Sequence, residues 1–389
     1  MGDTINLQLQ DIDGTVLTPL VQHYMNREVA EILHWQYKPL VGGVELESSL
    51  YRFTGEAKVK GETLQWTLIL KIIQSPADGN GDPLSFRYWK REALAYQSGV
   101  LNNLPGGITA PQCFATEEKT NGAYWIWMED IQDEIENSWP LEQYGIVARL
   151  LGRFNGAYLS GMPIPDQPWV TRQWLRKYLD HAAPAVDRLM HSMEHPLILR
   201  CLPGITAEFI QRIWNERLEI LDILEHLPQT FCHQDAFRRN LFFRHTPDKW
   251  PEVVAVDWSY SGVAAVGEEI APLVHASLEF GAVPKEDAFR LEQIVLEGYM
   301  DGLREVGWQG NPDTIRFSYA ATVYWRYVLG AFAGEMVSWM LDEQYHAAIE
   351  QAMGMSMEQL ADDTAKSIGW VQYIYDQVSR LKAGIKGIA

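Results

Sequence analysis

The strongest constraint on the fold is a change of hydrophobic pattern near residue 130. Before it, short apolar segments alternate with turn-like polar ones, which indicates a mixture of strands and helices. After it, apolar side chains recur at three- or four-residue spacing, beginning with Leu141, Tyr144 and Val147, so the rest is predicted to be mainly helical. A chain of 389 residues is also too long for one ordinary core. We therefore predict two domains, residues 1–129 and 130–389.

The first domain is predicted to contain a sheet and few helices. Strand-like segments lie at 40–44, 50–55, 64–73, 112–117 and 123–128. The segment LQWTLILKII at 64–73 is almost fully apolar, as in a strand between a core and a covered face, yet it contains Lys71. Helices are predicted at 27–33 and 85–101, a loop at 75–83, and an acidic linker, EDIQDE, at 129–134.

The second domain is predicted to be a set of helices interrupted by one insert. The helices are expected at 141–158, 171–193, 205–226, 285–305, 313–345 and 357–382. The insert, at about 229–266, contains two short apolar segments typical of strands, LFF at 241–243 and VVAV at 253–256. The aromatic run SYAATVYWRYVLGAF at 318–332 has two interpretations, the lining of a ligand pocket or, more commonly for such a run, part of the core.

Composition excludes several classes of protein. The 51 acidic and 32 basic residues give a net charge of −19, and such a surface repels nucleic acid phosphates. The same charge favours cationic small molecules, although it also serves solubility. The sequence has no run of 18 apolar residues and no apolar leader in MGDTINLQLQ, so we expect no membrane span and no secretory signal. Three Cys without a CxxC pair fit a reducing compartment, and we expect a cytoplasmic protein.

The insert carries the polar residues that are most indicative of chemistry. It reads FCHQDAFRRNLFF and then VVAVDW, which places His233, Asp235, Asn240 and Asp257 around two short strands. This pattern, His-x-Asp-x4-Asn followed by a strand that ends in Asp, resembles the catalytic and metal-binding segments of the aminoglycoside phosphotransferase and choline kinase-like family, distant relatives of protein kinases. All four polar positions match, and the resemblance extends over roughly residues 38–280.

The resemblance implies a role for each of these residues. Phosphoryl transfer is catalysed mainly by positioning and by neutralisation of charge. Asp235 would accept the proton of the attacking hydroxyl, while Asn240 and Asp257 would bind Mg²⁺, which prefers hard oxygen ligands. His233 would brace the loop rather than take part in the chemistry. The alternative interpretation is a polar turn between two core strands.

Lys71 and Glu92 in the first domain support the same family. A Lys inside an apolar strand is costly unless it is paired or bound to an anion. In kinase-like proteins a strand Lys holds the nucleotide phosphates and a helix Glu orients it, and Glu92 lies near the middle of the helix predicted at 85–101. Taken alone, such a pair is more often a surface salt bridge.

The resemblance implies two further segments of a nucleotide site. Gly42–Gly43 fits the loop that closes over the phosphates in the family, although two glutamates follow it, and Ser48 and Ser49 could donate hydrogen bonds there. Adenine is expected to contact main-chain groups near Glu129 and Ile131, after the apolar strand WIWM. Because main-chain recognition leaves no side-chain signature, ATP is expected and GTP is not excluded.

Two positions near the proposed base depart from the family pattern. Gln234 stands where members often have Gly, and this is expected to narrow the entrance to the base. Arg238 and Arg239 follow Asp235 by three and four residues, and Arg239 is a candidate catalytic residue that neutralises the transferring phosphoryl group. An Arg paired with a loop carboxylate is an equal alternative.

Two other acidic motifs have simpler interpretations. GEEIAPL at 267–273 resembles the helix start that follows the metal-binding Asp in the family, and Glu268 and Glu269 suit the first turn of a helix. DIDGTVL at 11–17 resembles the signature of haloacid-dehalogenase-like phosphatases. However, the preceding INLQLQ alternates rather than forming a buried strand, so we predict a surface turn instead.

The predicted fold is α+β and bilobal, a protein-kinase-like fold with a small mixed lobe on an antiparallel sheet and a larger, mainly helical lobe. The predicted function is ATP-dependent phosphorylation of a hydroxyl on a small molecule, with Mg²⁺. An aminoglycoside-like compound or an amino alcohol is an attractive acceptor given the charge. The alternatives are a non-catalytic nucleotide-binding module and a protein kinase, although DWSYSG after the strand lacks a recognisable kinase activation segment. No nucleic acid or membrane partner is expected, and the oligomeric state stays open.

Overall fold

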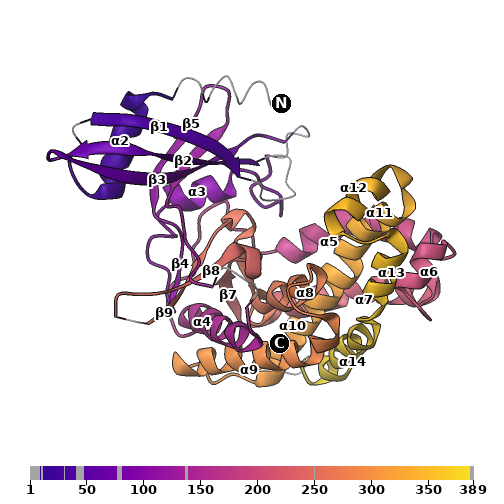
Figure 1. The fold of residues 1–389 in the computed structure, drawn as a ribbon. Helices are drawn as coiled ribbons and strands as arrows, with labels where there is room; N and C mark the ends of the chain where they lie inside the picture. The colour runs from indigo at the N-terminus through magenta and orange to yellow at the C-terminus, as the bar shows by residue number, and fades with distance from the viewer. Residues whose placement is uncertain are drawn as a thin grey trace. The chain divides into compact units, whose positions relative to one another are not determined.

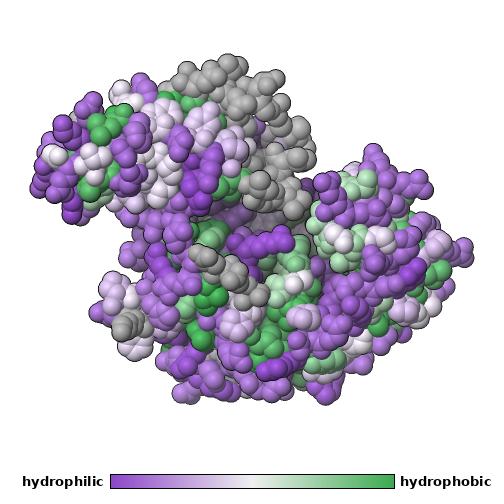
Figure 2. Space-filling view, in the orientation of Figure 1, coloured by the Kyte–Doolittle hydropathy of each residue, from purple (hydrophilic) through white to green (hydrophobic). Residues whose placement is uncertain are grey.

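The computed structural model describes residue 9 and residues 12–29, 31–40, 48–76, 81–135, 139–248 and 250–385. Within these ranges the chain forms two compact units (Figure 1). Unit 1 comprises the described residues of 1–81, 87–103 and 109–132, and unit 2 those of 82–86, 104–108 and 133–389. No helix in the described ranges is both long and apolar enough to cross a membrane. The visible face in Figure 2 is mostly hydrophilic, with hydrophobic residues scattered over it.

Unit 1 is built on a five-stranded sheet in which every neighbouring pair is antiparallel. The strand order is β1 (Glu31–Leu40), β2 (Ser48–Val59), β3 (Glu62–Ile73), β6 (Tyr124–Met128) and β5 (Cys113–Glu118). The strands predicted at 50–55, 64–73, 112–117 and 123–128 are confirmed, and the one predicted at 40–44 falls mostly outside the described residues.

The two faces of this sheet bury different residues. Leu68, Leu70 and Ile72 of β3 belong to a core that also contains Leu17 of the helix α2 (Gly14–Met25). Because successive residues of a strand point to opposite faces, Lys71 points to the face away from α2. The short helix α3 (Arg91–Gln97) contacts β5 and β6 and brings Glu92 to that side chain.

The prediction of a helix at 27–33 is wrong, because Glu31 already begins β1, where pairing with β2 overrides a local pattern that also fits a helix. The helix of this region is α2, which lies earlier in the chain. Asp13 caps it by accepting hydrogen bonds from the backbone N–H groups of Thr15 and Val16, at 2.8 and 3.1 Å. The described part of DIDGTVL is therefore a helix start, not the predicted surface turn, while Asp11 lies outside the described residues.

The helix predicted at 85–101 is much shorter in the structure. The Asp82 carboxylate accepts a hydrogen bond from the N–H of Leu84 at 3.0 Å, and its carbonyl accepts one from Ser85 at 3.0 Å. A turn therefore occupies the first part of the predicted helix, and α3 does not begin until Arg91. As a consequence, Glu92 lies in the first turn of α3 rather than in the middle of a long helix.

Unit 2 is mainly helical, as predicted. Its helices are α4 (Leu141–Leu159), α5 (Trp174–His191), α6 (Pro196–Cys201), α7 (Ala207–His226), α8 (Ala271–Glu279), α9 (Ala288–Glu305), α10 (Pro312–Thr322), α11 (Val337–Leu341), α12 (Glu343–Met353), α13 (Met357–Ala365) and α14 (Ile368–Ile385). The single helix predicted at 313–345 is wrong, since a π-helical segment, Val323–Met336, separates α10 from α11. The helix predicted at 357–382 is likewise divided into α13 and α14.

The closest helix pair in unit 2 is α4 against α9, which lie side by side in Figure 1. Glycines allow the contact: a Cβ on Gly152 would lie 2.1 Å from the Tyr299 carbonyl oxygen, and one on Gly302 would lie 2.0 Å from that of Arg149. The same helices hold Asn155, whose amide oxygen accepts from the Tyr299 hydroxyl at 2.7 Å. The Asn155 amide in turn donates to the carbonyl of Phe231 at 2.9 Å, so this packing supports the strand that leads into the predicted catalytic loop.

The insert predicted at 229–266 forms short strands. They are β7 (Gln229–Cys232), β8 (Leu241–His245), β9 (Pro251–Ala255) and β10 (Gly262–Ala265), and a further short strand, β4, spans Ile108–Thr109. β7 pairs antiparallel with β10, and β8 pairs antiparallel with β9 in a register that places Leu241 opposite Ala255. The three Cys are free thiols, with Cys201 and Cys232 buried.

Candidate active site

In unit 1 the structure brings Lys71 and Glu92 together. The Lys71 Nζ lies 2.5 Å from a Glu92 carboxylate oxygen, and the two side chains are only 8% and 1% exposed. A buried ion pair costs much of its attraction in desolvation, so its presence in an apolar strand is weak evidence for stability. The structure thus brings the two predicted residues together, and their roles toward a nucleotide stay predictions.

The segment that follows β6 is fixed to the sheet of unit 1. The Asp130 carboxylate lies 2.7 Å from Arg52 Nε and accepts a hydrogen bond from the Thr67 hydroxyl at 2.8 Å. The N–H of Glu129 donates to the carbonyl of Gln112 at 2.9 Å, so this group is already paired within the sheet. The predicted adenine contacts near Glu129 and Ile131 stay a prediction.

The loop segment predicted to cover the phosphates cannot be placed. Gly42–Gly43 and the side chain of Ser48 lie outside the described residues, although the backbone of Ser48 pairs with Ile73 across β2 and β3.

In unit 2, His233 joins the catalytic loop to its surroundings. Its Nε2 donates to the carbonyl of Val256 at 2.9 Å, and its Nδ1 accepts from the N–H of Asp235 at 3.2 Å. Its ring meets that of Trp258 edge-on at 4.6 Å between centroids. The two ring nitrogens therefore have different partners, which select one neutral tautomer. This arrangement suits a residue that holds the loop in shape.

Asp235 is the acidic side chain of this loop and is 25% exposed. The Asn240 amide nitrogen donates to its carboxylate at 2.8 Å and to its carbonyl at 3.1 Å. On another side, the Arg326 guanidinium lies 3.6 Å from its carboxylate. The carboxylate is thus held by two partners while part of it faces solvent, as a base that must reach a substrate requires.

The hairpin of β8 and β9 brings Asn240 and Asp257 next to each other. The N–H of Val256 donates to the carbonyl of Asn240 at 2.9 Å, and Asp257 is the next residue. Asp257 has φ +63° and ψ +67°, a left-handed conformation that a non-glycine residue adopts at a cost and that recurs at functional sites. The pair offers an amide oxygen and a carboxylate, which are hard donors that fit Mg²⁺.

The described residues contain no cluster of three or more His, Cys, Asp or Glu able to hold a metal ion. A site with only Asn240 and Asp257 is nevertheless consistent with Mg²⁺, because this ion keeps several waters and binds substrate phosphates beside one or two protein ligands.

Glu268 and Glu269 are part of the support of this loop, which the sequence interpretation missed. Glu269 accepts a hydrogen bond from the N–H of His233 at 2.8 Å, and Glu268 accepts from Ala265 N–H at 2.8 Å and from the Thr322 hydroxyl at 3.2 Å. Both are buried, and burial raises the pKa of each to about 7. Both also lie, as expected, in the first turn of a 3₁₀ helix, Glu268–Ile270, that leads into α8, but their hydrogen bonds give them a supporting role that the expectation did not include. The apolar residues on both sides of this pair, in VAAVGEEIAPL, could have indicated that the two carboxyl groups are buried.

Arg326 was also missed. It lies in the π-helical segment, is buried, and donates to the carbonyl of Gln234 at 2.5 Å. Its guanidinium stacks on the rings of Trp174 and Tyr327, at 4.1 and 4.7 Å from their centroids. An Arg in the apolar run YWRYVLGAF could have indicated a buried partner of opposite charge, in the same way that Lys71 did. Much of the rest of the longer run at 318–332 is core, including Tyr319 and Trp325.

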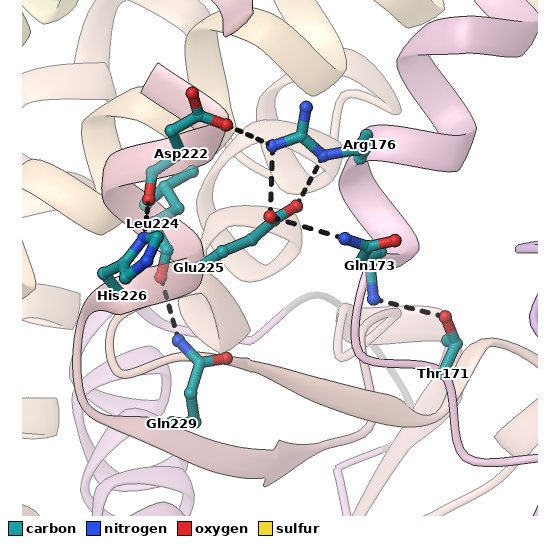
Figure 3. Close-up of polar contacts among 8 residues, drawn as sticks. All are labelled: Thr171, Gln173, Arg176, Asp222, Leu224, Glu225, His226 and Gln229. Atoms are coloured by element: carbon teal, nitrogen blue, oxygen red, sulfur yellow. Dashed lines mark hydrogen bonds and ion pairs between the residues drawn. The ribbon is translucent and has the colours of Figure 1, made fainter. Parts of the chain in front are cut away.

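The predicted effect of Gln234 on the entrance is wrong. Its backbone has φ +69°, a conformation that favours glycine, but its side chain is only 2% exposed and lines a small cavity of about 20 Å³ behind the loop. Arg176 of α5 and Glu225 of α7 also line this cavity, and Figure 3 shows their contact together with the contact of Arg176 with Asp222. A buried side chain cannot narrow an entrance.

The two arginines of the loop, Arg238 and Arg239, differ in their contacts and in their exposure. Arg238 lies 2.7 Å from Asp133, donates to the carbonyl of Ile135 at 2.8 Å, and stacks on the Trp139 ring at 4.5 Å. It is therefore the Arg that pairs with a carboxylate. Arg239 is exposed and lies over the ring of Phe280 at 4.2 Å.

A second cavity, of about 320 Å³, adjoins the loop. Its lining residues come from the loop and from the end of α8 and the residues after it: Phe237, Arg238, Arg239, Ala276, Ser277, Phe280 and Ala282.

Comparison with known proteins gives a family match and several similar folds. The model of the phosphotransferase enzyme family matches residues 62–306, more than half of the chain. A comparison with curated proteins gives no match.

Three solved structures illustrate the fold. An ethanolamine kinase from Plasmodium vivax is 10% identical, with a TM-score of 0.51, and the match covers 87% of this chain and 83% of that one. A choline kinase from Cryptosporidium parvum is 13% identical (TM-score 0.49; 90% and 91% covered), and an aminoglycoside phosphotransferase from Alicyclobacillus acidocaldarius is 16% identical (TM-score 0.47; 90% and 94% covered). At these identities the likeness shows the fold alone. The fold assignment rests on the ethanolamine kinase structure.

Proposed function

Because the chain belongs to the phosphotransferase enzyme family, we propose that Asp235 is the base of a reaction that transfers the terminal phosphoryl group of a nucleoside triphosphate to a hydroxyl of a small molecule. The observation that carries the proposal is the setting of Asp235. It is 25% exposed, Asn240 holds it at 2.8 Å, and a hairpin brings Asp257 beside that Asn. A carboxylate held in this way can accept a proton at one fixed position.

The proposed reaction balances as follows. The acceptor oxygen forms a bond to the terminal phosphorus, the bond from that phosphorus to the bridging oxygen breaks, and the hydroxyl proton passes to the Asp235 carboxylate. The nucleoside diphosphate leaves with the electron pair of the broken bond. Asn240 and Asp257 would hold Mg²⁺, which supplies charge neutralisation on the phosphates when bound.

Lys71 would hold the α- and β-phosphates, with Glu92 keeping its ammonium group in place at 2.5 Å. The main chain near Glu129 and Ile131 would hold the base, and ATP is the expected nucleotide, with GTP as the variant to test. His233 would keep the loop in shape rather than contact the substrate. An aminoglycoside-like compound or an amino alcohol is the acceptor class that the overall charge favours.

The structure gives no support to a protein kinase, the first alternative. After Asp257 the chain forms a 3₁₀ turn, Trp258–Tyr260, and enters β10 at Gly262, which leaves no room for a long activation segment. A non-catalytic module would need no accessible base, yet Asp235 is both held and partly exposed.

The test is release of diphosphate from Mg-ATP and, separately, Mg-GTP in the presence of hydroxyl compounds. The panel would contain aminoglycosides, choline, ethanolamine, amino sugars, nucleosides and macrolides. Asp235→Asn should abolish turnover and keep nucleotide affinity, while Asp301→Asn, an exposed residue that contacts Arg304 on α9, should change neither. Turnover that survives in Asp235→Asn, or a protein that binds no nucleotide, would contradict the proposal.

A further inference from the structure

The cavity of about 320 Å³ beside the catalytic loop has an unusual charge for this protein. The chain carries 51 acidic and 32 basic residues, yet the seven described residues that line the cavity include two Arg and neither Asp nor Glu. A cavity built to bind a cation would be expected to carry carboxylates, which are abundant elsewhere in the chain. The charged side chains of this lining are therefore opposite in sign to the net charge of the chain.

The two arginines are not equally available to a ligand. Arg238 already pairs with Asp133 at 2.7 Å and donates to the carbonyls of Ile135 and Leu241. Among the residues that the structure describes, Arg239 makes no ion pair, and its guanidinium is exposed. A guanidinium offers two parallel N–H donors, which match a carboxylate or a phosphate.

The other residues that line the cavity have aromatic or small side chains. The rings of Phe237 and Phe280 lie 5.6 Å apart at an angle of 38°, and Phe280 is 43% exposed. Ala276 and Ala282 add little bulk on the side of α8. An exposed aromatic ring beside a small wall offers a planar group a surface on which to stack.

The charge of the base is also compensated. The Arg326 guanidinium lies 3.6 Å from the Asp235 carboxylate and is itself buried. A cationic acceptor that approaches Asp235 therefore meets a paired carboxylate instead of an uncompensated negative charge, which weakens its electrostatic attraction.

We propose that this cavity binds the acceptor and that the acceptor carries an anionic group, a carboxylate or a phosphate, on a flat apolar body. Arg239 binds the anionic group, and Phe237 and Phe280 contact the flat part. The inference rests on the proposed phosphotransferase function and replaces the cationic acceptor that the overall charge favours. It also gives Arg239 a role in acceptor binding rather than on the transferring phosphoryl group.

The test uses four alcohols that differ only in the group opposite the hydroxymethyl group on a benzene ring. They are 4-(aminomethyl)benzyl alcohol, 4-methylbenzyl alcohol, 4-(hydroxymethyl)benzoate and 4-(hydroxymethyl)phenyl phosphate. Calorimetry in the presence of magnesium and a non-hydrolysable ATP analogue gives each dissociation constant. We expect the two anionic probes to bind at least about 10-fold more tightly than the amine, the effect of one charge-assisted pair.

Arg239→Glu should remove that preference and favour the amine. Arg290→Glu makes the same change of charge at an exposed position on α9 and should leave the preference intact. Binding of the amine as tight as that of the anions, or no binding of any probe, would overturn the proposal. So would an Arg239→Glu protein that loses turnover equally with every acceptor, because that result places Arg239 on the phosphoryl group. Nucleotide affinity, measured separately, tests the proposed function on its own.

Discussion

The candidate residues of the two units hold their charges in different ways. In unit 1, Lys71 and Glu92 form one close, fully buried pair on adjacent elements of a sheet and a helix. In unit 2, Asp235 is partly exposed and is held by Asn240 five residues later and by Arg326 from the π-helical segment. A buried pair depends on each partner for its charge balance, whereas a partly exposed base depends on several partners for its position. Loss of a partner should therefore cost stability in the first case and turnover in the second.

The largest effect is expected for Lys71→Met. This change leaves the Glu92 carboxylate buried without its cation, and we expect a loss of about 3–5 kcal/mol in the free energy of unfolding. The double variant Lys71→Met with Glu92→Leu should recover most of that stability and still fail to bind nucleotide. Chemical denaturation and nucleotide titration measure the two results. A single variant as stable as the parent would show that the pair is not buried as described.

In unit 2, a comparable effect on the free energy of unfolding is expected from a change of pH. Burial raises the pKa of Glu268 and of Glu269 to about 7, above the 4.5 of an exposed carboxyl. The folded protein then holds protons that the unfolded chain releases, so stability should fall as the pH rises from 4.5 to 7. The loss is on the order of 3 kcal/mol for each group.

Glu269→Gln should flatten this dependence in part, since Gln keeps an oxygen for the N–H of His233 but cannot ionise. Denaturation midpoints between pH 5 and 8 provide the measurement. Burial also raises the pKa of Glu292 to about 7, so a residual slope is expected from this group and Glu268. An unchanged slope in Glu269→Gln would mean that this carboxyl does not titrate in the range.

A smaller effect, on turnover alone, is expected for Arg326→Met. Without the guanidinium, the Gln234 carbonyl and the Asp235 carboxylate lose a common support, and a misplaced base lowers kcat by about 100-fold. The KM for ATP should stay the same, and Arg326→Lys should recover part of kcat. Arg176→Met, which breaks the contacts with Glu225 and Asp222 in Figure 3, is the matched control and should leave kcat unchanged. Equal losses in both variants would indicate general damage to unit 2.

The smallest effect is expected at the start of α2. Asp13→Ala removes the side-chain acceptor of two backbone N–H groups and should cost about 1 kcal/mol of stability. Turnover at a temperature where the variant is folded should not change. A loss of turnover with little loss of stability would revive an active role for the DIDGTVL motif.

Much of the fold and the family could be predicted from sequence. The α+β, kinase-like fold and the phosphotransferase family are confirmed, because close spacing carries the strongest signals: His233, Asp235 and Asn240 lie within eight residues of one loop. The roles assigned to them stay predictions. Lys71 was found because a charge in an apolar strand requires a partner.

The parts that failed depend on packing between distant segments. Arg326 lies 91 residues after Asp235, and Glu269 supports His233 from 36 residues away, so local pattern gave neither contact. The helix predicted at 27–33 failed for a similar reason, because pairing with β2 decides the conformation there. Gln234 was misplaced because a positive φ turns its side chain into the interior, and no sequence pattern shows a dihedral angle.

The π-helical segment has one more consequence. A π-helix closes its hydrogen bonds between residues five apart rather than four, so it contains more residues per turn than the α-helices on either side. Deleting Tyr324 would rotate Arg326 around the helix axis by roughly 100° relative to the residues that precede the deletion. Arg326 itself would be kept, yet its guanidinium would no longer face the catalytic loop. For this stretch of chain, length is as strict a requirement as composition.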